Sequence, residues 1–234
     1  MTRPLTVIPV AGVPEVRPGD VLADLLAAAV ALEDGDVVVV TQKVVSKAEG
    51  RLVRLDPGAG PAAAREVVER ESVRVLRRRG ELVVSETAHG FVCANAGVDL
   101  SNVAPGWAAL LPVDPDRSAR RIRDGLRGRA GVRVGVVVSD TFGRPWRRGV
   151  TDVAIGAAGV AAVVDLRGTA DALGRPLRVT EVCVADELAG AAELVMGKSS
   201  GIPAAVVRGV DPSWLRESSV RAEVVRPPAE DLFR

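Results

Sequence analysis

Polar side chains follow an apolar run in VVVVTQKVVSKAEGR, residues 37–51, where a loop held by a rigid strand would present groups to a ligand. Four valines lead directly into Thr41, Gln42 and Lys43, and Lys47 follows. Lys47 is a candidate phosphate partner, because an ammonium on a flexible stem can follow a charge that moves during transfer. The alternative is a strand end with a surface lysine.

A second stretch, SDTFGRPWRRG at residues 139–149, combines a candidate cation site with a candidate anion site. Asp140 and Thr141 stand at the expected end of an apolar strand, where they offer a carboxylate and a hydroxyl to a metal–phosphate complex. Arginine forks bind phosphate or carboxylate through two parallel hydrogen bonds. One short expected loop holds Arg144, Arg147 and Arg148. The alternative is a charged turn covered by a tryptophan, but the density of these groups favours function.

The segment NAGVDLSN, residues 95–102, surrounds Asp99 with Asn95, Ser101 and Asn102 and contains no lysine or arginine. A lone carboxylate among amides and hydroxyls is typical of a site for a hard cation such as Mg²⁺ or Mn²⁺. The alternative, which this segment alone favours, is an Asx-turn in which Asp and Asn bond their own backbone.

The segment MGKSSGIP, residues 196–203, brackets Lys198, Ser199 and Ser200 with two glycines. Glycine lets backbone N–H groups approach phosphate oxygens, although a helix C-cap at Gly197 explains the pattern equally well. The Walker A pattern GxxxxGK[ST] is absent from the sequence. GAGPAA at residues 58–63 fits a dinucleotide fingerprint only superficially, because a charged, proline-containing stretch precedes it instead of a buried strand. The lone histidine, His89, does not predict a hydrolase triad.

Strand-like and helical patterns alternate irregularly along the chain, so we expect an α/β (α+β) fold with mixed or antiparallel pairing in one domain, residues 1–234. The region from Val210 onward is rich in proline and charge and is expected to be a peripheral tail. The predicted helices are Val21–Leu32 with Asp20 as cap, Pro61–Arg79, Asp116–Leu126 and Asp186–Met196. The predicted strands are Leu5–Val10, Val37–Thr41, Leu82–Ser85, Phe91–Ala94, Val134–Ser139, Val179–Val184 and Ala204–Val207.

The composition restricts the partners. The chain is 47% hydrophobic and 26% charged, as expected of a folded globular protein, and its net charge of +1 gives no electrostatic footprint for nucleic acid. No apolar run reaches the length of a membrane span, about 18 residues. Cys93 and Cys183 show no metal-binding spacing and are expected to be small buried hydrophobes in a reducing compartment. We therefore expect a cytoplasmic protein.

Taken together, the segments resemble the coenzyme F-420:γ-glutamyl ligase family. The resemblance is carried by VVTQKVVSKAEGRLV, HGFVCANAGVDLSNV, SDTFGRPWRRGVTDVAIGAAGV and VADELAGAAELVMGKSSGIPAAVVRG, with VIPVAGVPEVRPGD at the N-terminus. These segments cover nearly the whole chain in the family's order, and the DTFGRPWR run is quite specific. The chain looks most like the bacterial branch, without the nitroreductase-like domain to which that branch is often fused.

The resemblance implies GTP-dependent addition of L-glutamate to the carboxylate of F-420-0 through an acyl phosphate. It also implies Mg²⁺ or Mn²⁺, a K⁺ requirement and a homodimer with an unusual mixed α/β fold. By position, it makes Asp99 and Asp140 ligands of one cation and Thr141 a ligand of a second, with Lys47 also catalytic. The implied GTP-contacting residues are Val13, Pro14, Glu15, Val16, Gln42, Lys43, Lys47, Asn102, Met196, Gly197, Lys198, Ser199, Ser200, Gly201, Ile202 and Pro203.

One position departs from the family pattern: archaeal members carry an acidic second-metal ligand where this chain has Lys198. Charged lysine cannot ligate Mg²⁺, so our hypothesis is that its ammonium replaces part of the second ion's role. Arg144, Arg147 and Arg148 have no transferable family role, and we expect them to bind a substrate phosphate or carboxylate. Two alternatives remain: an amide ligase of the same fold with another carboxylate acceptor, and a nucleotide-binding module that has lost catalysis.

Overall fold

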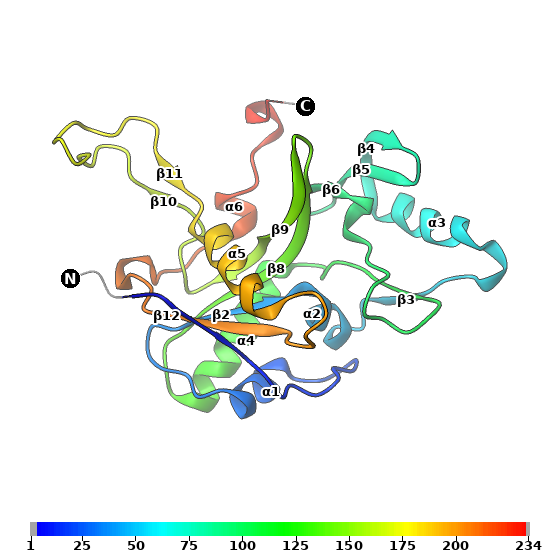
Figure 1. Cartoon of the computed structure of the whole chain (residues 1–234), viewed down its shortest axis with the longest axis horizontal. Helices are drawn as coiled ribbons and strands as arrows, with labels where there is room; N and C mark the ends of the chain where they lie inside the picture. The colour runs from blue at the N-terminus through cyan, green and yellow to red at the C-terminus, as the bar shows by residue number, and fades with distance from the viewer. Residues whose placement is uncertain (1–3, 233–234) are drawn as a thin grey trace.

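The computed structural model describes residues 4–232 and is organised around one central sheet in the strand order β1-β12-β2-β8-β9 (Figure 1). Within the described residues, β2 and β8 form the one parallel pair, and every other ladder is antiparallel. The expected mixed, largely antiparallel α/β fold is therefore confirmed. The central strands are β1 (Thr6–Pro9), β2 (Val37–Thr41), β8 (Gly135–Arg144), β9 (Arg147–Ala158) and β12 (Ala204–Arg208).

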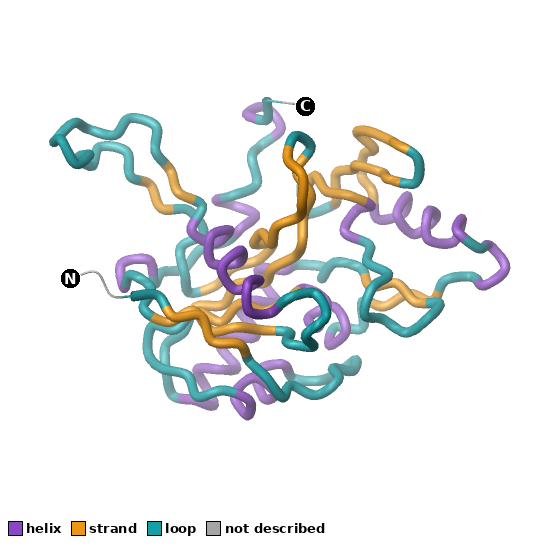
Figure 2. Tube along the Cα trace, viewed as in Figure 1, coloured by secondary structure: helices purple, strands orange, loops and turns teal. Residues whose placement is uncertain are grey.

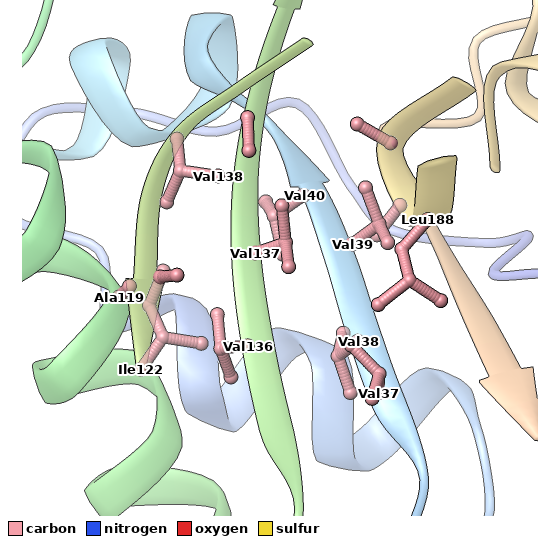
Figure 3. Close-up of a cluster of buried hydrophobic side chains, with 14 of the residues drawn as sticks. Val37, Val38, Val39, Val40, Ala119, Ile122, Val136, Val137, Val138 and Leu188 are labelled. Atoms are coloured by element: carbon pink, nitrogen blue, oxygen red, sulfur yellow. The ribbon is translucent and has the colours of Figure 1, made fainter. Parts of the chain in front are cut away.

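Alternating valines on β2 and β8 build the core between helices on the two faces of the sheet. Figure 3 shows Ala119 and Ile122 on the side of Val136 and Val138, with Leu188 beside Val37 and Val39. All four valines of β2 are fully buried, as a strand covered on both faces requires. The helices are α1 (Leu22–Ala29), α2 (Gln42–Ala48), α3 (Pro61–Glu71), α4 (Pro115–Ala130), α5 (Val184–Met196) and α6 (Val220–Glu223).

Three smaller sheets extend from this body (Figures 1 and 2). The three-stranded sheet lies beside α3, and the β10–β11 arm projects on the opposite side of the molecule (Figure 1). Within residues 4–232, no helix combines the length and apolarity needed to cross a bilayer. The remaining strands are β3 (Leu52–Arg54) with β7 (Trp107–Ala109), β4 (Ser72–Arg79) with β5 (Leu82–Thr87) and β6 (Val92–Ala94), and β10 (Val164–Asp165) with β11 (Glu181–Val182).

The predicted helix Pro61–Arg79 is wrong in its second half, because α3 ends at Glu71 and β4 follows. Ser72 begins the strand, and its hydroxyl donates to Val68 O at 2.6 Å and lies 2.8 Å from Ser85 Oγ, from which it can accept. The SVRV stretch, with β-branched valines at alternate positions, then pairs with β5 and suits a pleated sheet better than a helix. The predicted strand Val179–Val184 is likewise reduced to Glu181–Val182, and α5 begins at Val184.

Two further expectations are corrected. Asp20 does not cap α1, whose N-cap is Val21; its carboxylate accepts instead from the Arg17 N–H at 2.7 Å. The chain beyond Val210 is not a peripheral tail, because Val220 is fully buried and its N–H donates to the buried Asp116 carboxylate at 2.9 Å. Burial of this apolar residue, together with the satisfied carboxylate, fixes α6 to the body.

Candidate functional site

One edge of the central sheet collects nearly all the predicted site segments. Strands β1 and β2 end at this edge, the antiparallel β12 begins there, and the pairing of β8 with β2 stops there, as the pairs Pro9↔Ala205, Val40↔Ala204 and Thr41↔Ser139 show. The Thr41 N–H donates to Pro203 O at 3.0 Å, which joins the end of β2 to the loop before β12. Segments far apart in sequence therefore meet because of the sheet order.

The lysines of the first segment lie on a helix that the sequence did not predict. Helix α2 begins at Gln42, directly after β2, so residues four apart share one face. Gln42 and Ser46 are buried and bonded to each other at 2.8 Å, with the Gln42 Nε2 lacking a protein partner. Lys43 and Lys47 occupy a second face, and the Lys47 Nζ lies 2.5 Å from Glu15 Oε1. This contact brings the predicted nucleotide segment Val13–Val16 to the same helix.

Asp99 is not the lone carboxylate that its own segment indicated. The Lys43 Nζ lies 2.7 Å from Asp99 Oδ2 and donates to Ser101 Oγ at 2.8 Å. The Asx-turn alternative also holds, because Asp99 Oδ1 accepts from the Ser101 N–H at 2.7 Å. Burial acts to raise the pKa of Asp99, but the hydrogen bonds from Lys43 and Ser101 hold it below its usual value. Nearby, Asn95 is used structurally, accepting from the Val83 N–H at 3.0 Å, and Asn102 is exposed with φ +53.

Asp140 lies within β8 rather than in a loop at its end. The pairing with β2 stops at Ser139, and β8 continues to Arg144 in a long hairpin with β9, so Asp140 is the first residue past the end of β2. Burial raises the pKa of Asp140 to about 7, and the charges of Asp99 and Asp152 act in the same direction against a Thr141 backbone hydrogen bond and Lys43. Asp99, Asp140 and Lys43 are therefore close enough for their charges to interact.

The other face of the β8–β9 hairpin carries a second charged cluster centred on Asp152 of β9, which the sequence analysis missed. Asp152 is 3% exposed, and its carboxylate accepts from Thr141 Oγ1 at 2.6 Å and from Ser139 Oγ at 3.0 Å. Since Ser139 and Thr141 share this face, Asp140 between them points to the opposite one. The only sequence signal was the position of Asp152 before the apolar run VAIGAAG, which is weak.

Lys198 completes this second cluster. Its ammonium lies 3.0 Å from Asp152 Oδ1 and 2.8 Å from Glu193 Oε1, and it donates to the Thr141 hydroxyl. Burial acts to lower the pKa of Lys198, but the hydrogen bonds with Glu193 and Asp152 raise it overall, so the group is a fixed cation at neutral pH. The ammonium thus occupies space beside Thr141, the residue predicted to hold a second cation.

The loop from Met196 to Pro203 begins with a helix C-cap at Gly197, which the sequence analysis gave as the alternative to a phosphate-binding loop. The Gly197 N–H donates to Glu193 O at 2.9 Å, and Gly197 and Gly201 have φ of +62 and +71. The Ser200 hydroxyl donates to Met196 O. The cap does not exclude the nucleotide role, because the loop returns to the sheet edge at Pro203. Ser199 and Gly201 are exposed there, and Ile202 is half-buried.

The predicted arginine loop is instead the tip of the β8–β9 hairpin, away from the sheet edge (Figure 1). Arg144 pairs with Arg147 across the tip, and Arg147 and Arg148 are exposed. The buried Nε of Arg144 has no protein hydrogen-bond partner. The structure does not bring these arginines into the clusters of Asp140 and Asp152, and their anion-binding role stays a prediction.

The geometry agrees with two exclusions made from the sequence: a dinucleotide fingerprint at residues 58–63 and a hydrolase triad that includes His89. The stretch before residues 58–63 is the partly buried strand β3, paired antiparallel with β7, not the buried parallel strand of a dinucleotide fold. The His89 ring contacts Thr87 Oγ1 and Pro112 O and stacks on Phe91 at 5.3 Å. Cys93 is buried and Cys183 half-buried, and both are free thiols.

A cation site is chemically suited to the Asp99–Asp140 pair. Two negatively charged carboxylates that are partly desolvated repel each other, and a nearby positive charge stabilises both. Among the described residues, no group of three His, Cys, Asp or Glu side chains could hold a metal, so any ion there would depend on two carboxylates, neutral oxygens and water. Mg²⁺ is commonly bound in this way beside substrate phosphates. The carboxylates, lysines and glycine-bearing loop at this edge therefore fit the predicted cation site and phosphate contacts, which stay predictions.

Comparison with known proteins gives the family. The family model F420-0:Gamma-glutamyl ligase matches residues 12–209. A protein named coenzyme F420:L-glutamate ligase from Methanopyrus kandleri is 47% identical over 94% of this chain and 94% of its own. Proteins of the same name from Methanothermobacter thermautotrophicus and Archaeoglobus fulgidus are 41% and 44% identical, over 98% and 97% of this chain and 99% and 96% of theirs. The chain belongs to the F420-0:γ-glutamyl ligase family. The bacterial-type assignment stays a prediction.

Proposed function

We propose that this protein is a GTP-dependent ligase that joins the amine of L-glutamate to the carboxylate of coenzyme F420-0, with later additions through the γ-carboxylate. The observation that supports it most is the meeting of Lys43, Lys47 and Lys198 with Asp99, Asp140 and Asp152 at one sheet edge. Phosphoryl transfer requires mainly positioning and charge neutralisation, and this arrangement supplies both without a protein nucleophile.

The proposed reaction has two steps. A carboxylate oxygen of the acceptor attacks the γ-phosphorus of GTP, so that a new P–O bond forms, the β–γ bridging P–O bond breaks and GDP leaves. The neutral amine of glutamate then attacks the acyl carbon; the C–N bond forms, the C–O bond to phosphate breaks, and the nitrogen releases a proton. Activation is needed because a free carboxylate is a poor electrophile.

The chain's own residues are assigned the following parts. Lys43 and Lys47, on one face of α2, would bind phosphate oxygens after leaving Asp99 and Glu15. Asp99 and Asp140 would hold a Mg²⁺ or Mn²⁺ ion, which supplies neutralisation of phosphate charge when bound. The backbone N–H groups of residues 196–203 would contact the nucleotide, since both glycines keep that loop open to close approach.

Lys198 is proposed to supply part of the positive charge of a second ion. This is supported by the contacts of its ammonium with Asp152, Glu193 and Thr141, the residue predicted to hold a second cation. Titration of Mn²⁺ with GDP present should give one tight site in the wild type and a second in Lys198→Glu. Two tight sites in the wild type would end this hypothesis.

Mass spectrometry of the product tests the proposed function. The protein is incubated with GTP, Mn²⁺, glutamate and F420-0, and the acceptor should gain one glutamyl unit or more, with phosphate release that depends on both acceptor and glutamate. Replacing glutamate with hydroxylamine should trap the acyl phosphate as a hydroxamate. Asp140→Asn should abolish release while the protein stays folded. Product with other carboxylates only would indicate a different acceptor, and no phosphate release would indicate a binding module.

A homodimer and a K⁺ requirement belong to the same proposal. Light scattering after gel filtration should give twice the chain mass of 24.4 kDa. Replacement of K⁺ by Na⁺ at constant ionic strength should lower the rate of phosphate release. A monomeric, K⁺-independent ligase would refute these two parts and leave the reaction itself standing.

A further inference from the structure

A cavity of about 450 Å³ lies between the β8–β9 hairpin, the loop before β6 and the C-terminal segment. Its walls include Phe91, Phe142, Val153, Val220, Val224 and Val225. The size and apolar, aromatic lining are typical of pockets for small organic ligands. None of the predicted nucleotide-contacting residues lines it.

The cavity opens on the same face of the hairpin as the Asp140 carboxylate. Asp140 and Phe142 are two residues apart on β8, so their side chains point to one face, about 7 Å apart along the strand. Val153 lies directly opposite Asp140 in the β8–β9 ladder, and neighbours of this kind have Cβ atoms about 5 Å apart. A molecule in the cavity can therefore extend a flexible arm to Asp140.

Aromatic rings form one wall of the cavity. Phe91 and Phe142 meet edge to face, with ring centroids 6.3 Å apart. The His89 ring stacks on Phe91, with centroids 5.3 Å apart. Aromatic pairs of this geometry are favourable beyond their buried area. Asp186 and Arg226 also line the cavity and add a carboxylate acceptor and a guanidinium donor, which match a heterocycle that carries ring N–H and carbonyl groups.

Two other cavities do not share these features. The cavity of about 550 Å³ between α1, α2 and α4 is lined by Asp20, Glu49, Asp114 and Arg121 and by no aromatic ring. The cavity of about 420 Å³ beside Arg123, Arg127 and Arg133 has no described aromatic lining either. Neither includes a residue of the β8–β9 hairpin near Asp140.

We propose that the cavity beside Phe91 and Phe142 binds the planar deazaflavin ring of the acceptor, with the acceptor's arm leading its carboxylate to Asp140. The inference rests on the proposed function, which makes coenzyme F420-0, a deazaflavin with a carboxylate on its side chain, the acceptor. The deazaflavin ring would therefore bind apart from the nucleotide site at the sheet edge. The acceptor and GTP would reach Asp140 from different elements of the fold.

A matched pair of tryptophan substitutions tests the ring site. Val92 lines the cavity and is 39% exposed, whereas Val113 lines the 550 Å³ cavity and is 71% exposed, so both positions tolerate a larger side chain. Titration calorimetry with 5-deazariboflavin, which has the ring and a ribityl chain but no phosphate or carboxylate, should show about tenfold weaker binding for Val92→Trp and unchanged binding for Val113→Trp. The KM for F420-0 should rise in the same variant, with the KM for GTP unchanged.

The outcomes separate this proposal from the proposed function. Product formation by the wild type with an unchanged KM for F420-0 in a folded Val92→Trp overturns the ring site alone. No glutamylated product from the wild type overturns the proposed function and the ring site with it. Should Val92→Trp fail to fold, Phe142→Leu replaces it, with weaker 5-deazariboflavin binding expected and unchanged binding again refuting the site.

Discussion

Asp152→Asn tests whether the buried carboxylate on β9 positions Lys198. The substitution keeps the side-chain shape but removes the charge and replaces one acceptor oxygen with an NH₂ donor. In the native protein that carboxylate accepts from Thr141 Oγ1 at 2.6 Å and from Ser139 Oγ at 3.0 Å, and the Lys198 Nζ lies 3.0 Å away. At least one of these donors must therefore lose its acceptor.

The size of the effect follows from burial. Loss of a hydrogen bond to a charged acceptor that is 3% exposed costs roughly 1.5–3 kcal/mol. The lower half of that range applies, because the Lys198 side chain is 55% exposed and keeps Glu193 at 2.8 Å. A loss of about 2 kcal/mol lowers the Tm of a chain of this size by about 4–8 °C. Displacement of the Lys198 ammonium should lower kcat about 10- to 100-fold if it stabilises the transferring phosphoryl group.

Differential scanning fluorimetry and steady-state phosphate release measure these two effects. Asp165→Asn is the matched control, because it removes a carboxylate from an exposed pair with Arg167 at 2.7 Å on the β10–β11 arm, and it should change neither Tm nor kcat measurably. Lys198→Gln should reproduce the kcat loss of Asp152→Asn. An Asp152→Asn protein with wild-type Tm and kcat would refute the positioning argument.

Further predictions concern packing and ionisation. A Cβ on Gly125 would meet Ala23 Cβ at 2.5 Å, whereas nothing lies within 4 Å of a Cβ on Gly128 of the same helix. By chemical denaturation, Gly125→Ala should therefore lower the free energy of unfolding by about 1–3 kcal/mol, and Gly128→Ala should raise it by about 0.5–1 kcal/mol. Equal effects would contradict the close α1–α4 approach. Burial, with the charge of Asp140, raises the pKa of Cys93 to about 12 from 9.0, so at pH 8 its thiol stays protonated and should react with iodoacetamide about a thousandfold more slowly than in the urea-unfolded chain. Rapid alkylation of folded protein would refute that.

Local patterns in the sequence determined the elements whose periodicity agrees with their burial. The valine runs of β2 and β8 predicted buried strands, and both faces of these strands are covered. Helices α4 and α5 were predicted from acidic residues at their starts and, in α4, from the four-residue spacing of Ile122 and Leu126. The polar segments around Lys47, Asp99, Asp140 and Lys198 could be identified as candidates, since functional groups gather where strands end. Periodicity failed at β4, where VRVL fits both a helix and a strand and only the partner β5 decides.

Only the tertiary structure decided how these candidates combine. Spacing along the chain cannot show that Lys43 pairs with Asp99, because the two residues are 56 positions apart and meet only where the fold brings the Asp99 segment to the start of α2. Spacing also cannot show that Thr141 and Asp140 face opposite sides of β8. Nor can it show that Asp152, which belongs to no motif, forms an ion pair with Lys198. Residue type determines which chemistry is available, whereas the alternation of a strand and the order of a sheet determine which groups share a space.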